Sequence, residues 1–135
     1  PLGALLDKYP SKAVPTFRPD AAGLLTIDRA SFHEIFAQDL PRAQTSVMAV
    51  TQKPLASSAF GATTKVGAWR NIPSWFIVAQ NDNVINPDLE RFFAKRMGAK
   101  IIEIESSHVV FMSHPEELAA VIESPARTPR AVSQR

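Results

Sequence analysis

The stretch "IPSWFIVAQNDNVINPDLERFFAKRMGAKIIEIE", residues 72–105, decides the predicted fold of this chain. It contains a nearly continuous apolar run from Trp75 to Ala79, which is typical of a strand buried on both faces of a parallel sheet. It ends in the alternating segment 100–105, which we expect to be a second strand. A helical segment separates the two. Strand, helix and strand in this order predict a parallel pair in an α/β sheet.

The helix between the two strands has clear start and stop signals. Asn86 is a suitable N-cap, Pro87 occupies the first helical position, and Gly98 is a suitable residue to end the helix. The apolar residues of this segment recur on one stripe, at Leu89, Phe92, Phe93 and Met97. After the second strand, a short helix that opens at Pro115 is expected over residues 115–123.

The first half of the chain carries weaker signals. Residues 1–22 contain four prolines, so we expect a loop or a series of short turns there. A short strand is expected over 23–28. A helix is expected over 29–40, with Asp28 as its N-cap, and a second helix after Pro41.

Composition restricts the classes of partner. The chain has 135 residues, 45% of them hydrophobic and 21% charged, as expected for one soluble domain. A net charge of +2 is too small to imply nucleic acid binding, so no nucleic acid partner is expected. The absence of cysteine excludes disulfides, thiolate catalysis and cysteine-bound metals. No apolar run of about 18 residues and no signal segment occur, so no membrane partner is expected and a cytoplasmic location is favoured.

Two polar residues lie where chemistry is expected in such a sheet. Asp82 and His108 each follow the carboxyl end of a predicted strand, where open α/β sheets bind their ligands. Neighbouring strands run about 4.8 Å apart, so loops that leave the same edge can bring a carboxylate to an imidazole. Such an acid would orient the histidine as a general base. The alternative interpretation is a turn aspartate and a packed or solvated histidine.

The chain also resembles a known family. The segments "WRNIPSWFIVAQNDNVINP" (69–87) and "KIIEIESSHVVFMSHPEELAAVI" (100–122) resemble the C-terminal part of an α/β-hydrolase, in the branch of small esterases and plant hydroxynitrile lyases. The segments "GLLTIDRASFHEIFAQDLP" (23–41) and "TQKPLASSAF" (51–60) resemble the cap of bacterial esterase-like members. The resemblance implies a mostly helical cap or lid over 1–70 and a C-terminal β-α-β-α unit of the hydrolase core over 71–124. Residues 125–135 have little to bury and are expected to be a disordered tail.

This resemblance implies hydrolysis of small carboxylic acid esters by Ser-His-Asp acyl transfer, without a cofactor or metal. Asp82 matches the triad acid and His108 the base, whereas the family's nucleophile lies in a G-x-S-x-G elbow. No serine here is flanked in that pattern, and Ser57 and Ser58 lie in cap-like sequence. We therefore expect the nucleophile, the N-terminal strands and the oxyanion hole to lie outside this chain. The chain alone should be inactive.

Substrate contacts are predicted in the cap and beside the histidine. Phe32, Phe36 and Phe60 could line an apolar acyl pocket, with core packing as the alternative role. The plant lyases place a lysine directly after the catalytic histidine, whereas this chain has Val109 there, which favours ester hydrolysis. Ser106 and Ser107 are predicted to be turn residues whose hydroxyls satisfy the loop backbone.

A second class of function remains open from the sequence. The apolar strand 74–79 would have an unpaired edge in a two-strand sheet, and such edges pair with other chains. We therefore expect self-association or docking with an N-terminal half. A catalytically inactive fragment that acts as an assembly module is the alternative to the esterase part.

Overall fold

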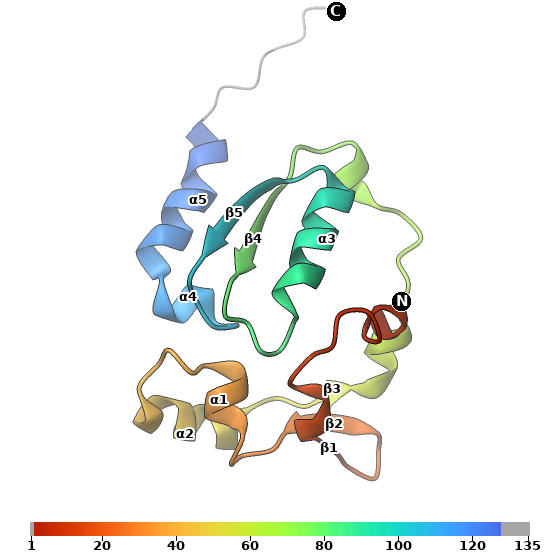
Figure 1. Cartoon of the computed structure of the whole chain (residues 1–135), viewed down its shortest axis with the longest axis vertical. Helices are drawn as coiled ribbons and strands as arrows, with labels where there is room; N and C mark the ends of the chain where they lie inside the picture. The colour runs from red at the N-terminus through yellow and green to blue at the C-terminus, as the bar shows by residue number, and fades with distance from the viewer. Residues whose placement is uncertain (1, 128–135) are drawn as a thin grey trace, which may run out of the picture.

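The computed structural model describes residues 2–127. In Figure 1, the sheet of β4 and β5 with its helices lies above a second part that contains β1 to β3, α1 and α2. Strands β4 (Trp75–Ala79) and β5 (Lys100–Ile104) are parallel, with Trp75 opposite Lys100 and Ala79 opposite Ile104. Helix α3 (Pro87–Met97) connects them, so the predicted β-α-β unit is confirmed.

Helix α3 begins and ends as its sequence predicts. The Asn86 side chain accepts a hydrogen bond of 2.9 Å from the backbone N–H of Asp88, and Pro87 is the first helical residue. Gly98 ends the helix with a φ of 64°, in the left-handed region that glycine adopts without steric cost. Leu89 and Ala94 bury their side chains. The helix is thereby fixed at both ends, and it holds the loops before and after it.

The strand β4 is buried only toward its carboxyl end. Val78 is fully buried, whereas Trp75 is 40% exposed. Burial on both faces was expected for the whole strand. This expectation is wrong for Trp75, the first residue of β4. The carboxyl end, where the candidate site lies, is the well-packed end.

Two helices follow β5. The short α4 (Val110–Ser113) was not predicted, and α5 (Pro115–Arg127) opens at Pro115 as expected. Helix α5 continues beyond the predicted end at residue 123, so it includes the first three residues of the segment expected to be disordered. The rest of that segment, 128–135, lies outside the described residues. No helix within residues 2–127 has the length and apolar character needed to cross a bilayer.

The first part of the chain contains more strand than expected. Instead of being mostly helical, it has an antiparallel sheet in the order β1-β2-β3, with Phe17 opposite Ile27 and Leu25 opposite Leu55. The strands are β1 (Phe17–Pro19), β2 (Leu24–Ile27) and β3 (Leu55–Ala56). The helices are α1 (Phe32–Phe36) and α2 (Arg42–Thr51), with the 3-10 helices η1 (Leu2–Leu5), η2 (Val14–Thr16), η3 (Ser57–Gly61) and η4 (Ala68–Arg70).

Helix α1 is shorter than the sequence predicts. Asp28 does not cap it, because its carboxylate accepts a hydrogen bond from the Ser31 hydroxyl and forms an ion pair with Arg18 at 3.5 Å. Ser31 occupies the N-cap position, and Ala37 ends the helix with an extended φ of −154°. The residues after Ala37 are thereby free to turn toward β4 and β5.

The hydrophobic core joins the two parts of the molecule. One cluster, Ile27, Phe32 and Ala49, lies within the first part. A second cluster joins Ala37 and Leu40 to Val109, which directly follows His108. The cap-like part therefore packs against the loop that carries the candidate base.

Candidate active site

The loop after β4 fixes Asp82 through both carboxylate oxygens. Oδ1 accepts the backbone N–H groups of Val84 at 2.6 Å and Ile85 at 3.0 Å. Oδ2 lies 2.7 Å from Nδ1 of His108. The residue is only 4% exposed. Because the loop supplies two donors to one oxygen, the other oxygen is aimed at the imidazole.

The loop after β5 presents the other ring nitrogen of His108. A carboxylate at Nδ1 favours the tautomer with the proton on Nδ1, which leaves the lone pair of Nε2 free to accept a proton. Nε2 has no hydrogen-bond partner among the described residues, and the side chain is 28% exposed. The structure thus brings together the predicted acid and base in the geometry that a general base requires.

An apolar hollow in the cap begins beside the imidazole. The ring of Phe36 lies 5.0 Å from the ring of His108 between centroids, and also 5.0 Å from the ring of Phe32. Both phenylalanines line a hollow of about 340 Å³. Its other lining residues come from the cap-like part: Phe17, Leu25, Ile27, Met48, Thr51, Gln52, Lys53 and Leu55.

The other two predicted substrate contacts lie elsewhere. Phe60 does not line this hollow; its ring packs 6.0 Å from that of Phe17, on the side of a smaller cavity of about 50 Å³. Val109 is fully buried against Ala37 and Leu40. Its side chain is therefore occupied by core packing.

Glu90 is a buried acid near Asp82 and His108, and the sequence analysis did not identify it. It lies on α3, is 8% exposed, and its Oε2 accepts the backbone N–H of Ala79 at 2.9 Å. Burial, together with repulsion from Asp82, raises the pKa of Glu90 to about 7. The sequence signal available for Glu90 was its position directly after Leu89, a residue of the apolar stripe of an amphipathic helix. A second carboxylate thus lies within electrostatic reach of the acid–base pair.

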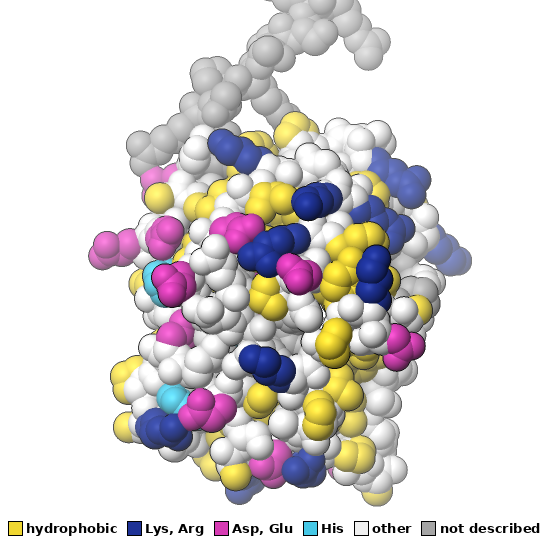
Figure 2. All heavy atoms as spheres, in the orientation of Figure 1, with side chains coloured by type: hydrophobic (Ala, Val, Ile, Leu, Met, Phe, Trp, Pro, Cys, Tyr) yellow, Lys and Arg dark blue, Asp and Glu magenta, His cyan; other side chains and the backbone are white. Residues whose placement is uncertain are grey.

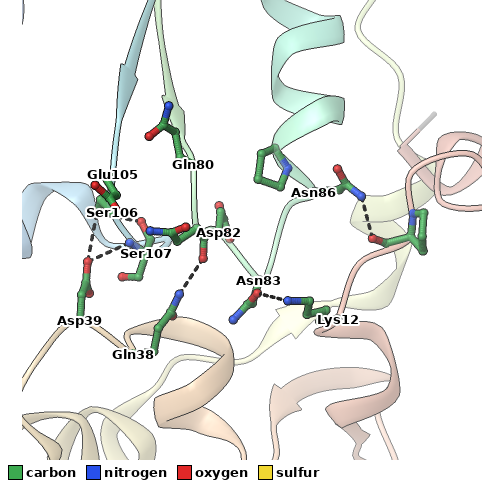
Figure 3. A pocket seen from close by; sticks show the side chains of 13 residues that line it. Lys12, Gln38, Asp39, Gln80, Asp82, Asn83, Asn86, Glu105, Ser106 and Ser107 are labelled. Atoms are coloured by element: carbon green, nitrogen blue, oxygen red, sulfur yellow. Dashed lines mark hydrogen bonds between the residues drawn. The ribbon is translucent and has the colours of Figure 1, made fainter.

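A polar cavity of about 480 Å³ lies at the carboxyl ends of β4 and β5 (Figure 3). Asp82 lines it from the first loop and Ser106 and Ser107 from the second, while Gln38 and Asp39 reach it from the cap-like part. The remaining lining residues are Pro10, Lys12, Gln80, Asn81, Asn83, Asn86, Pro87 and Glu105. Sequence reasoning did not identify Gln38 or Asp39.

The serines considered earlier do not supply a nucleophile at His108. Ser106 and Ser107 are buried. The hydroxyl of Ser107 accepts from Val109 N–H within the loop, as predicted, whereas that of Ser106 lies within hydrogen-bond distance of the side chains of Asp39 and Ser113 as well as of Ser107 O. Ser57 and Ser58 lie exposed in η3. Within residues 2–127, no serine hydroxyl bonds to Nε2, and no group of three metal-ligating side chains is present.

This chain belongs to the alpha/beta hydrolase family, because the family's sequence profile matches residues 1–121. The fold agrees with that of solved hydrolases. The crystal structure of the pyrethroid hydrolase PytH with BIF matches with a TM-score of 0.65 at 22% identity, over 87% of this chain and 50% of that chain. The pyrethroid hydrolase from Sphingobium faniae JZ-2 matches with a TM-score of 0.65 at 22% identity, over 87% of this chain and 51% of that chain.

The chain therefore spans about half the length of these solved structures. Its β-α-β-α unit and cap-like part have the fold of a C-terminal portion of an α/β hydrolase. A search of the curated proteins finds no match.

Proposed function

We propose that this chain supplies the acid and the base of a serine hydrolase that acts on esters of small carboxylic acids. The observation that carries the proposal is the 2.7 Å contact between Asp82 Oδ2 and His108 Nδ1, at the carboxyl ends of two parallel strands. In this proposal the nucleophilic serine and the oxyanion hole come from residues outside this 135-residue chain.

The proposed mechanism is acyl transfer in two halves. The serine hydroxyl attacks the ester carbonyl while Nε2 of His108 takes its proton, and Asp82 holds the imidazolium that forms. The intermediate expels the alcohol, which takes the proton back from Nε2. Water then attacks the acyl group in the same way and releases the carboxylic acid, so that both half-reactions use the same proton site.

The apolar hollow supports an ester with an apolar portion. Phe36, whose ring lies 5.0 Å from that of His108 between centroids, lines the hollow, which has room for a group of about 340 Å³. Pockets for small molecules are mostly apolar with few polar groups. We place the apolar portion of the ester against Phe32 and Phe36.

The test is ester turnover by this chain alone and by a chain extended upstream through a G-x-S-x-G segment. We expect p-nitrophenyl acetate and butyrate to be hydrolysed by the extended chain only. His108→Ala and Asp82→Asn should each lower kcat by about 10³- to 10⁴-fold, since the members of a triad act as a unit.

The matched control for this test is His33→Asn. His33 bonds through Nδ1 to the Thr45 hydroxyl inside the cap, at 3.0 Å, and Asn can keep such a bond. This variant should retain turnover. Full activity of the His108→Ala variant would contradict the proposal, as would turnover by the short chain that depends on His108.

Assembly without catalysis is the second candidate function, and the open edge of β4 favours it. Ser74 O and Gln80 N–H bond to β5, so the alternate backbone groups of Trp75, Ile77 and Ala79 point to the other edge. No strand among the described residues pairs with that edge. In this alternative, a second copy of the chain pairs with that edge and no catalysis follows.

A further inference from the structure

Two consecutive cap residues contact the two loops that carry the acid and the base. Gln38 Nε2 donates a hydrogen bond of 2.6 Å to the carbonyl of Asn81, the residue before Asp82. Asp39 Oδ2 accepts a hydrogen bond of 2.8 Å from the N–H of Ser107, the residue before His108. Figure 3 shows both contacts at the mouth of the polar cavity.

These two contacts and a hydrogen bond between the two loops together form a closed ring of interactions. The N–H of Asn81 donates to the carbonyl of Ser106 at 3.1 Å, and the hydroxyl oxygen of Ser106 lies within hydrogen-bond distance of Asp39 Oδ2, at 3.2 Å. Each loop is therefore tied to the other and to the segment after α1. The ring fixes backbone atoms one or two residues from each member of the acid–base pair.

The loop provides a specific site for the Asp39 carboxylate. Partial burial opposes its ionisation, but hydrogen bonds from the loop serines, first from Ser107, hold the pKa of Asp39 below its ordinary value. Ser106 and Ser107, which donate these bonds, are themselves buried. Asp39 is an exposed residue, but its carboxylate accepts a backbone N–H directly, and hydrogen bonds to an ionised acceptor are stronger than neutral ones.

We propose that Gln38 and Asp39 are positioning residues that hold Asp82 and His108 in register, an inference that rests on the proposed function. We call them the cap clamp. The clamp touches neither the substrate nor the reacting atoms. It acts through the backbone of Asn81 and Ser107, so that displacement of the cap loosens the contact between Asp82 and His108. The hydrolytic geometry is thereby made to depend on a seated cap.

The first test uses the 135-residue chain and nuclear magnetic resonance of His108, so it requires no activity. The hydrogen bond from Nδ1 to Asp82 should give a downfield proton resonance. We expect Asp39→Ala to broaden or abolish that resonance. Asp39→Asn, which keeps an oxygen that can accept the Ser107 N–H, should largely restore it. Gln38→Ala should weaken it in the same sense as Asp39→Ala.

The control is Glu34→Gln, because the Glu34 side chain is exposed and pairs with Arg42 inside the cap, while the bond from Asn83 Nδ2 is accepted by the backbone carbonyl of Glu34 and does not depend on the side chain. It should leave the resonance unchanged. Circular dichroism establishes that each variant is folded. If Asp39→Ala does not fold, Gln38→Ala decides the outcome. A wild-type resonance in the folded Ala variants of Gln38 and Asp39 would overturn the proposal.

The second test separates the clamp from the proposed function. In an extended chain with a nucleophile, Asp39→Ala should lower kcat roughly 10- to 100-fold with little change in KM, since a small misplacement of a catalytic group has this effect. Asp39→Asn should recover most of the rate. An extended chain without esterase activity would refute the proposed function, and the resonance data alone would then test the clamp. An active enzyme indifferent to Asp39→Ala would refute the clamp alone.

Discussion

Glu90 shows how one buried side chain can link stability to pH. Its Oε2 accepts the Ala79 N–H, which points to the open edge of β4, so the carboxylate satisfies one backbone group there. Burial and the nearby Asp82 raise its pKa from 4.5 to about 7. Between these two values the folded chain holds a proton that the unfolded chain releases. Stability therefore falls as pH rises from about 4.5 to about 7, and levels off above.

Glu90→Gln should remove this dependence. Glutamine keeps an oxygen for the Ala79 N–H but does not titrate, so the variant should gain up to about 3 kcal/mol over wild type above pH 7 and nothing below pH 4.5. Thermal unfolding between pH 4 and pH 8 measures the difference. Glu116→Gln, on the exposed start of α5, is the control. Parallel Tm curves for wild type and Glu90→Gln would refute the linkage.

At the residue scale, the sequence predicts what position along a strand can decide. Asp82 and His108 follow adjacent parallel strands, so the general rule for α/β sheets brings them together, and the structure does so. Gln38, Asp39 and Glu90 were missed because their contacts are tertiary. The sequence around Asp39 does not indicate that its carboxylate will accept a hydrogen bond from the N–H of Ser107. That contact depends on the turn after α1.

At the scale of elements, the β-α-β unit depends on the ends of α3. Gly98 ends the helix at a φ of 64°, and a Cβ built there meets no atom within 4 Å. The space would admit a side chain, whereas the backbone conformation disfavours one. The effect of a substitution at this position is therefore conformational alone.

Gly98→Ala should destabilise the chain by about 1 kcal/mol, the cost of a left-handed alanine. Gly61→Ala is the matched control, because its Cβ also meets nothing within 4 Å but its φ is not positive. Urea unfolding of both variants gives the comparison. An equal effect of the two substitutions would contradict the conformational explanation.

Elements with local signals are the ones that the sequence predicts. Helix α3 carries its own cap and stop residues, and β4 and β5 are regular apolar segments. The cap sheet was missed because β3 has only two residues, both exposed, and exists through its pairing with β2. The length of α1 was overestimated because Asp28 bonds to Ser31 and Arg18 instead of capping a helix.

At the scale of the whole molecule, the chain spans about half of the solved hydrolases and leaves a sheet edge open. Apolar side chains also lie exposed among charges of both signs on the face in Figure 2. Trp75 in β4 and Ile72 shortly before it in the chain are among the exposed hydrophobic residues. Edges and patches of this kind lead to association.

We therefore expect the 135-residue chain to self-associate at micromolar concentration. Trp75→Lys places a charge on the edge strand where the side chain is already 40% exposed, and should shift the distribution toward the monomer. Light scattering coupled to size exclusion gives the molar mass of each. A monodisperse wild-type monomer under these conditions would contradict the expectation.

The global arrangement was predictable only in part. The order of strands and helices predicts the sheet edge at which the site forms, because parallel strands leave their carboxyl ends together. The packing of the cap-like part at that edge depends on the cluster of Ala37, Leu40 and Val109. These residues are apolar like many others in the chain, so their sequence context does not single them out.

The clamp also has a consequence for how the chain folds. The contact between Asp82 and His108 joins residues 26 positions apart, whereas that between Gln38 and Asn81 spans 43 and that between Asp39 and Ser107 spans 68. Closing longer loops costs more chain entropy, and contacts distant in sequence slow folding. The antiparallel pair of β1 and β2 and the β-α-β unit can form from nearby residues first. We therefore expect the contacts of Gln38 and Asp39 with the two loops to form later, so that the proposed acid–base geometry is completed late in folding.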